Sequence, residues 1–580
     1  MWQVRTVAAA LTLCGALSLG EAATMRDTLS DTWVATDALG RGLPTSPQAC
    51  RQARADRFVG MFYFLWLGNH SKDLHDLTEI LAANPEQPAF GPVNAFHHWG
   101  QPQFGYYFSA DEWVLARHAQ MLSAAGVDTI IIDVTNAFTY DETLLTLCRV
   151  WTDMRAHGQA TPQLAFITHS SSAKTVTHLY DAFYAKNLYP ELWFRWKGKP
   201  LMLWDSGELR PEVADFFSLR RSWAWSGRDG WFGDGKDAWT WLDHYPQKPG
   251  WHEDPKRPEA LSVSVAQHPI SNIGRSFHAG KEPPAAEQRP ELGLCFAEQC
   301  RRALEVDPEF VFVTGWNEWV AQRFLNKGGM SLGGRKLAVD DSFFVDTYSQ
   351  EYSRDIEPMR PRPGGGDHGD NYYYQLVDFI RHYKGVRQRP LAGPPATPTG
   401  PADFATVTPE FLATTGGPVQ RDAEGFGGRK YLNSSLHNRI DSAKLARDGQ
   451  TLFAWVRCEA AITSPDSDRW MNLLLDIDAD AGTGWHGYDL LVNRRQPERG
   501  AATVERFADG AWHEVGRARL VVDGAELMLA IPRELLGRPV LTSIDFKWTD
   551  NAGLPERLED WLDQGCAAPL GRSNFRYEIR

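Results

Sequence analysis

Cysteine, positive charge and long apolar runs are all scarce in this chain of 580 residues. Of its 7 cysteines, Cys14 lies in the N-terminal apolar segment, and the others are too few for a disulfide framework in a chain of this length. Acidic residues outnumber basic ones by 73 to 60 and no run of Lys or Arg occurs, so we expect no nucleic-acid partner. Beyond the N-terminus no segment approaches a bilayer-spanning apolar length, so we expect no membrane span.

Several familiar motifs are also missing. No Gly-x-Gly-x-x-Gly follows the first strand-like run, which argues against a nucleotide-binding fold, and no Gly-x-Ser-x-Gly supports a serine hydrolase. The histidines show neither His-x-His nor His-Glu-x-x-His spacing. We therefore expect no catalytic metal and no cofactor.

Residues 1–23 have the three-part form of a secretory signal peptide. A basic start that includes Arg5 precedes an apolar core, and small residues follow through Ala22 and Ala23. The mature chain is expected to begin near residues 23–25, and the protein is predicted to be secreted or periplasmic.

After a polar lead-in (24–57), β-type and helical patterns alternate along the chain. Eight short apolar runs are typical of strands, at 58–67, 129–134, 163–168, 200–204, 222–225, 239–242, 261–266 and 310–313. Helical spacing is found at 113–125, 142–156, 173–185, 211–220 and 296–304, and closing helices are expected at 341–352 and 371–383. Strands joined through helices pair in parallel, so residues 58–386 are predicted to form an α/β fold, a (β/α)8 TIM barrel, with an open doubly wound sheet as the alternative.

The character of the sequence changes near residue 387. Five prolines between residues 387 and 408 predict a stiff, extended linker. Residues 409–580 then contain short strand-like runs roughly ten residues apart, with turn signals such as Asp509-Gly510 and Asp523-Gly524. This spacing is typical of an antiparallel β-sandwich, so we expect a second domain that folds independently.

Phe310–Trp319 is the stretch in which a catalytic group is most clearly expected. An apolar run ends in Trp316-Asn317-Glu318-Trp319, which sets a carboxylate just past a strand end between two indoles. Indole faces suit the C–H surfaces of a pyranose, and the 23 tryptophans of the chain fit the same kind of ligand. An ordinary strand end, whose Glu is solvated or caps a helix, is the alternative.

In a barrel the active site is built at the carboxyl ends of the strands. Glycoside cleavage needs one protonated and one ionised carboxyl group, and we expect Glu318, Asp133 and Asp205 to supply them. Asp133 is the preferred partner of Glu318. The first and eighth strands are neighbours in a closed barrel, and Asp133 belongs to the second strand, only one strand beyond the first. The substrate-binding residues expected at other strand ends are Asn136, His169, Asp243 and His268. For each carboxylate at a strand end, the alternative is that it caps the following helix or pairs with arginine.

Residues 90–107 form a long aromatic segment after the first predicted strand. The segment contains His98 and Trp99 and is too long for a minimal connection, and long loops of this kind are more often functional than structural. We expect it to form a wall of the substrate site, with His98 and Trp99 contacting sugar alongside Trp316, Asn317 and Trp319.

Gly315-Trp316-Asn317-Glu318-Trp319, with the later Asp355-Ile356-Glu357-Pro358, resembles the glycoside hydrolases of families 99 and 71, the endo-α-mannosidases and their relatives. Those families carry Trp-Asn-Glu-Trp, a second Glu two residues beyond the second Trp, and an Ile-Glu-Pro close behind. The resemblance implies a (β/α)8 glycoside hydrolase acting on a poly- or oligosaccharide, with Glu318 as the first acid. Ala321 stands where the second Glu would be, which leaves open a non-catalytic polysaccharide-binding or export protein.

Three C-terminal segments, Trp470–Asp476, Thr483–Asp489 and Asp545–Trp548, resemble the β-sandwich carbohydrate-binding modules of the family-nine and heme-binding-like group. Within them Asp476, Asp478 and Asp480 alternate as calcium ligands can. A charged hairpin turn is the alternative interpretation.

Overall fold

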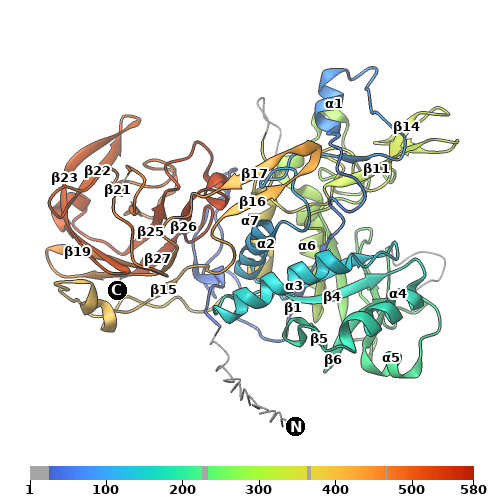
Figure 1. The fold of residues 1–580 in the computed structure, drawn as a ribbon, viewed down its shortest axis with the longest axis horizontal. Helices are drawn as coiled ribbons and strands as arrows, with labels where there is room; N and C mark the ends of the chain where they lie inside the picture. Colours follow the sequence, from blue (N-terminus) through green and yellow to red (C-terminus); the bar gives the residue numbers. More distant parts are fainter. Residues whose placement is uncertain (1–24, 225–232, 362–367, 466, 580) are drawn as a thin grey trace, which may run out of the picture.

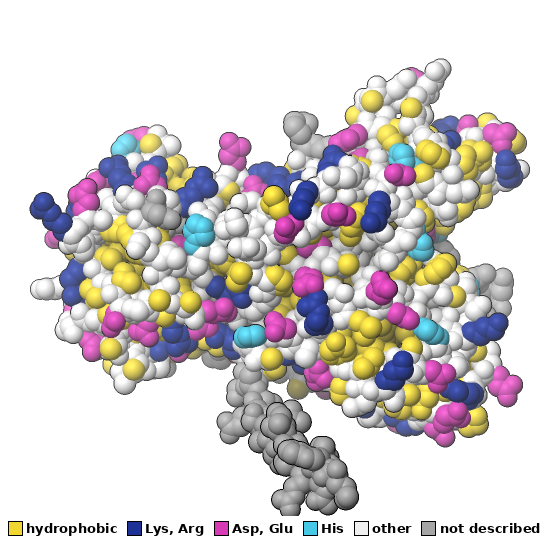
Figure 2. Space-filling view, viewed as in Figure 1, with side chains coloured by type: hydrophobic (Ala, Val, Ile, Leu, Met, Phe, Trp, Pro, Cys, Tyr) yellow, Lys and Arg dark blue, Asp and Glu magenta, His cyan; other side chains and the backbone are white. Residues whose placement is uncertain are grey.

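The computed structural model describes residues 25–224, 233–361, 368–465 and 467–579, which form a barrel and a large antiparallel sheet lying side by side (Figure 1). The predicted signal peptide lies outside the described residues, as does Trp225 of the fifth predicted strand. Basic and acidic side chains are interspersed over the face seen in Figure 2. Within the described ranges, the helices are too short or too polar to cross a bilayer.

Eight parallel strands form the barrel, as the sequence predicts. They are β1 (Phe58–Tyr63), β3 (Thr129–Val134), β4 (Gln163–Thr168), β6 (Lys199–Trp204), β7 (Ser218–Trp223), β8 (Ala238–Thr240), β9 (Ala260–Ser264) and β10 (Phe310–Thr314). They pair in the order β8-β7-β6-β4-β3-β1-β10-β9, and β8 lies against β9 without a ladder in the described part, so the barrel is nearly closed. Because β1 lies between β3 and β10 and the order follows the chain around the ring, the doubly wound alternative is excluded.

Helices surround this ring at most of the predicted places. They are α1 (Leu77–Ala83), α2 (Glu112–Ala125), α3 (Asp141–Ala156), α4 (Ser172–Leu179), α5 (Pro211–Phe216), α6 (Leu294–Val306) and α7 (Asn371–Lys384). The helix predicted at 211–220 is too long, because the chain turns extended at Phe217 and enters β7. The closing helix predicted at 341–352 is wrong, since residues 342–344 form a strand instead.

A small antiparallel sheet extends from the loop that carries Glu318. Its central strand, β11 (Val320–Leu325), begins two residues after Glu318 and pairs with β2 (Phe96–His98) on one side and β14 (Ser342–Phe344) on the other. The hairpin of β12 (Ser331–Leu332) and β13 (Arg335–Lys336) lies between β11 and β14 in sequence. The pairing brings segments 90–107 and 341–355, far apart in sequence, to the same place as Glu318.

The C-terminal region is an antiparallel β structure, as predicted. One continuous sheet contains β15 (Phe411–Leu412), β18 (Ile440–Arg447), β19 (Thr451–Cys458), β20 (Asn472–Asp476), β21 (Leu490–Val492), β22 (Ala501–Ala508), β23 (Ala511–Asp523), β24 (Glu526–Pro532), β25 (Ser543–Asp550), β26 (Cys566–Ala568) and β27 (Phe575–Glu578). The ring of Phe411 in β15 packs edge-on against Phe546 in β25, so the sheet curves back over a shared apolar core.

Contacts tie the C-terminal region to the rest of the chain at several places. The hairpin of β16 (Arg421–Glu424) and β17 (Lys430–Asn433) lies against the barrel (Figure 1), where the Tyr106 N–H donates to the Tyr431 hydroxyl at 2.7 Å. Val34 of the lead-in forms a β-bridge with Asn574, and Leu391 of the proline-rich segment forms one with Glu578. The domain boundaries and independent folding stay predictions.

Candidate active site

Glu318 lies in the loop after β10, at the end of the barrel where the parallel strands finish. Asn317 fixes this loop on the continuation of β1. Its Oδ1 accepts the Phe64 N–H at 2.9 Å, and its Nδ2 donates to the Phe64 carbonyl at 3.0 Å. Glu318 is thereby held in the interior, where it is only 3% exposed.

Arg354 pairs with Glu318 inside the protein. Its NH2 lies 2.5 Å from Glu318 Oε2, and its NH1 donates to two backbone carbonyls, one of them that of Asp346 at 3.1 Å. Asp355 holds the other side of the loop, since its Oδ1 accepts the Glu318 N–H at 2.5 Å and its Oδ2 accepts the Trp99 indole N–H at 2.8 Å. Asp355 falls within the motif noted in the sequence, whereas no sequence signal marks Arg354.

Four carboxyl groups surround this one arginine: those of Glu318, Asp355, Asp133 and Asp346. Asp346 Oδ1 lies 3.6 Å from Arg354 NH2. Burial raises the pKa of Glu318 well above its ordinary value, with Arg354 opposing and the charges of Asp346, Asp355 and Asp133 adding to the rise. Burial also raises the pKa of Asp355 to about 7 and that of Asp133 to about 6. Arg275 also acts on this group and lowers the pKa of Asp355, but burial and the neighbouring carboxylates together oppose ionisation of Glu318.

Two of the other predicted residues lie in the same group as Glu318. Asp133 is 5% exposed, and its Oδ1 accepts the Thr135 N–H at 3.0 Å. Burial lowers the pKa of His268 to about 4, with Arg354 adding repulsion, so His268 is neutral near pH 7. The structure thus brings Asp133, His268 and Glu318 together around Arg354.

Asp205 belongs to a second group of side chains. It follows β6, which lies opposite β10 in the order of strands around the barrel. Its Oδ2 is 3.2 Å from His169 Nδ1, and the His169 ring lies against the Trp223 indole with 3.7 Å between the ring centroids. Asp243 accepts the backbone N–H groups of His244 and Lys248 and so stabilises its own turn. Asn136 is exposed beside the β3 end.

The predicted sugar-binding indoles are enclosed in the core. Trp99, Trp316 and Trp319 have no exposed surface, and Trp99 stacks on Trp319 with centroids 4.6 Å apart. His98 is also buried, which lowers its pKa to about 3, and it packs against the Phe426 ring. In this structure these side chains support the Glu318 loop and present no face to a substrate.

Half-buried tryptophans that sequence reasoning missed occupy the strand ends instead. Trp204 and Trp223 end β6 and β7, and Trp241 follows β8. The Trp241 ring lies 5.5 Å from the Arg354 guanidinium carbon, directly beside the carboxylates. Their position after apolar strand runs is the signal that could have identified them.

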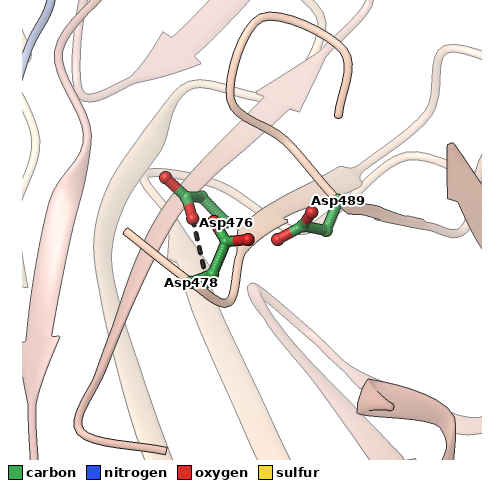
Figure 3. A group of neighbouring side chains, drawn as sticks. All are labelled: Asp476, Asp478 and Asp489. Carbon is green, nitrogen blue, oxygen red and sulfur yellow. Dashed lines mark hydrogen bonds between the residues drawn. The ribbon is translucent and has the colours of Figure 1, made fainter. Parts of the chain in front are cut away.

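A group of acidic side chains lies outside the barrel, in the C-terminal sheet. Asp476, Asp478 and Asp489 each offer an oxygen within 4.8 Å of the others (Figure 3). Asp480 is not part of this group. Backbone N–H groups donate to Asp476 and Asp489, and Arg538 lies 2.7 Å from Asp478, so much of the negative charge is already compensated. Calcium binding here stays a prediction.

Comparison with known proteins gives distant structural similarities. No family model and no curated protein matches the chain. Two structures of the GH99 endo-alpha-mannosidase from Bacteroides thetaiotaomicron are similar, one of them in complex with Bis-Tris propane. The complex has a TM-score of 0.33 and 12% identity, covering 57% of this chain and 98% of the mannosidase. The other has a TM-score of 0.34 and 14% identity, covering 58% and 100% respectively.

Proposed function

We propose that the protein is an exported glycoside hydrolase that cleaves a poly- or oligosaccharide with Glu318 as its general acid. The observation that carries the proposal is the grouping of carboxyl groups around Arg354 at the carboxyl ends of the barrel strands. Burial and neighbouring negative charge raise the pKa of Glu318 well above its ordinary value. A carboxyl group with a raised pKa, beside a second carboxyl group, suits protonation of a glycosidic oxygen.

A non-catalytic polysaccharide-binding protein is the second candidate, and one observation favours it. Ala321, where the second acid of the resembling families would stand, is 1% exposed and packs in an apolar cluster with Leu77 and Phe344. The residue directly opposite it in the β2–β11 pair is His97, so no acidic side chain stands at this position of the structure. If no other group replaces that acid, the barrel binds sugar without cleaving it.

Reducing-end formation on a panel of bacterial and plant polysaccharides separates the two candidates. Glu318→Gln should lower kcat by roughly two orders of magnitude or more on any polysaccharide that the wild type cleaves, because it removes the proton donor. Glu309→Gln is the matched control, since it makes the same change at the opposite end of β10, where Glu309 is half-buried and pairs with Lys197. Near-normal turnover in Glu318→Gln contradicts the proposal, and polysaccharide retention without cleavage supports the binding protein.

A further inference from the structure

Ala321 has no ionisable side chain, so the second catalytic carboxylate, the partner of Glu318, must come from another position. Asp355 is fully buried and holds the Glu318 loop through both of its oxygens, so two carboxylates remain as candidates: Asp133 from β3, and Asp346 from the segment that follows β14. The two side chains differ in exposure and in what surrounds them.

The position of Asp346 fits the spacing of a retaining pair. Glu318 Oε2 and Asp346 Oδ1 lie 2.5 and 3.6 Å from the same nitrogen, NH2 of Arg354, so they are no more than about 6 Å apart. After burial, Asp346 is the carboxylate that contributes most to raising the pKa of Glu318, ahead of Asp355 and Asp133. Retaining glycosidases hold their two carboxyl groups roughly 5–5.5 Å apart, whereas inverting enzymes need about 6.5–9.5 Å.

Exposure favours Asp346 as well. Its side chain is 40% exposed, whereas that of Glu318 is 4% exposed and the whole of Asp133 is 5% exposed. A nucleophile must reach the anomeric carbon of the substrate, and an exposed aspartate side chain can do so. Asp133 is buried, and burial opposes its ionised form.

The surroundings of Asp346 suit a sugar. The Trp241 ring is half-buried and lies 5.5 Å from the Arg354 guanidinium carbon, which provides an apolar face beside the carboxylates. Within the described residues, the Nε of Arg354 and the indole nitrogen of Trp241 are both buried without a hydrogen-bond partner.

We infer that Asp346, and not Asp133, is the catalytic nucleophile opposite Glu318 in a retaining mechanism, an inference that rests on the proposed function. The Glu318 carboxyl gives its proton to the glycosidic oxygen, which leaves with the electron pair of its bond to the anomeric carbon, while an Asp346 oxygen bonds to that carbon. Water then attacks the anomeric carbon and loses a proton to the Glu318 carboxylate. The bond to Asp346 breaks, which restores both groups and keeps the anomeric configuration.

The test uses two probes and four variants of the full chain. The probes are the polysaccharide with the highest wild-type rate in the reducing-end assay and the 2,4-dinitrophenyl glycoside of the oligosaccharide released from it. The variants are Asp346→Ala, Asp133→Asn, Glu318→Gln and the control Asp340→Ala, whose side chain is 66% exposed on the same segment. Circular dichroism checks that each variant is folded.

Asp346→Ala should lower kcat at least about 100-fold on both probes, and sodium azide should restore turnover by forming a glycosyl azide of inverted anomeric configuration. Glu318→Gln should lose activity on the polysaccharide but keep much of it on the dinitrophenyl glycoside, whose leaving group needs no proton. Asp133→Asn should lose less than about 10-fold, and Asp340→Ala should behave as wild type.

Near-normal turnover in Asp346→Ala, or an azide product from Asp133→Asn instead, overturns the inference and leaves the proposed function standing. Products of inverted configuration from the wild type also overturn it. A wild-type protein that cleaves none of the panel overturns the inference and the proposed function together.

Discussion

The buried ion pair between Arg421 and Asp111 should hold the C-terminal hairpin on the barrel. Arg421 Nε donates to Asp111 Oδ2 at 2.8 Å, and the two side chains are 7% and 2% exposed. The guanidinium also lies 4.4 Å from the Tyr431 ring centroid and 5.2 Å from that of Trp113. Asp111 Oδ1 accepts the Trp113 N–H and so caps α2, which means that this carboxylate cannot move away from the barrel.

Arg421→Met keeps the apolar stem but leaves the Asp111 charge buried without its cation. Breaking a buried pair in this way costs about 3–5 kcal/mol of the free energy of unfolding. Lys430→Met is the matched control, because Lys430 lies on the same hairpin and pairs with Asp422 at 3.0 Å, but the two side chains are 60% and 69% exposed. An exposed pair of this kind contributes only about 0–1 kcal/mol.

Urea unfolding followed by tryptophan fluorescence measures both effects. Arg421→Met should move the first unfolding transition to lower urea, and Lys430→Met should not. In the double variant Arg421→Met/Asp111→Asn, part of the loss should return, because the unpaired charge is gone while the amide oxygen can still cap the helix. Equal and small shifts in Arg421→Met and Lys430→Met would refute the reasoning.

Four further predictions follow from the structure and the sequence. Asp205→Asn should act mainly on KM in the steady-state kinetics of the cleaved polysaccharide, because Asp205 lies across the ring from Glu318; a kcat loss equal to that of Glu318→Gln contradicts this. Burial alone would raise the pKa of Asp307, but hydrogen bonds from two arginines outweigh it and hold that pKa well below its usual range. Asp307→Asn should therefore lower stability at pH 7, and thermal melts should show the difference shrinking as pH falls below roughly 4, since the wild type loses the contribution there. A fragment of residues 409–580 should fold on its own by circular dichroism, and an unfolded fragment would instead mean that contacts with the rest of the chain are required. Exported protein should begin near Ala23 by N-terminal sequencing, and an intact N-terminus would contradict the signal peptide.

The barrel could be predicted from the sequence because its strands are local, continuous apolar runs. Ile130, Ile131 and Ile132 are fully buried, so a parallel strand covered on both faces shows itself without any knowledge of its partners. The closing helix expected at 341–352 is predicted wrongly because the conformation of this segment is decided by pairing with a distant strand and not by a local pattern. Its apolar residues include Phe343 and Phe344, which fit helical spacing, but pairing with β11 decides that they are extended.

The candidate site could be predicted only in part, because it is assembled from segments that are distant in sequence. Glu318 follows β10 and Asp133 lies near the end of β3, two strands of one sheet, so strand order alone predicts that they lie near each other. Arg354 and Asp346 arrive through the segment after β14, whose path depends on pairing between β2, β11 and β14. No local sequence pattern specifies that pairing, so no sequence signal identifies Arg354, the arginine that contacts Glu318 and Asp346.

The surroundings of Glu357 show why a motif alone does not identify a catalytic group. This Glu stands in the Ile-Glu-Pro element that resembles known hydrolases, yet it is fully buried and accepts from the Tyr107 hydroxyl at 2.7 Å and the Trp319 indole at 2.5 Å. His118 Nε2 lies 3.1 Å from its other oxygen. A buried carboxylate is tolerated only when donors surround it, and here the donors are the side chains that hold the Glu318 loop. Glu357 therefore positions the Trp319 indole. We expect other carboxylates, which the sequence pattern does not mark, to contact the substrate.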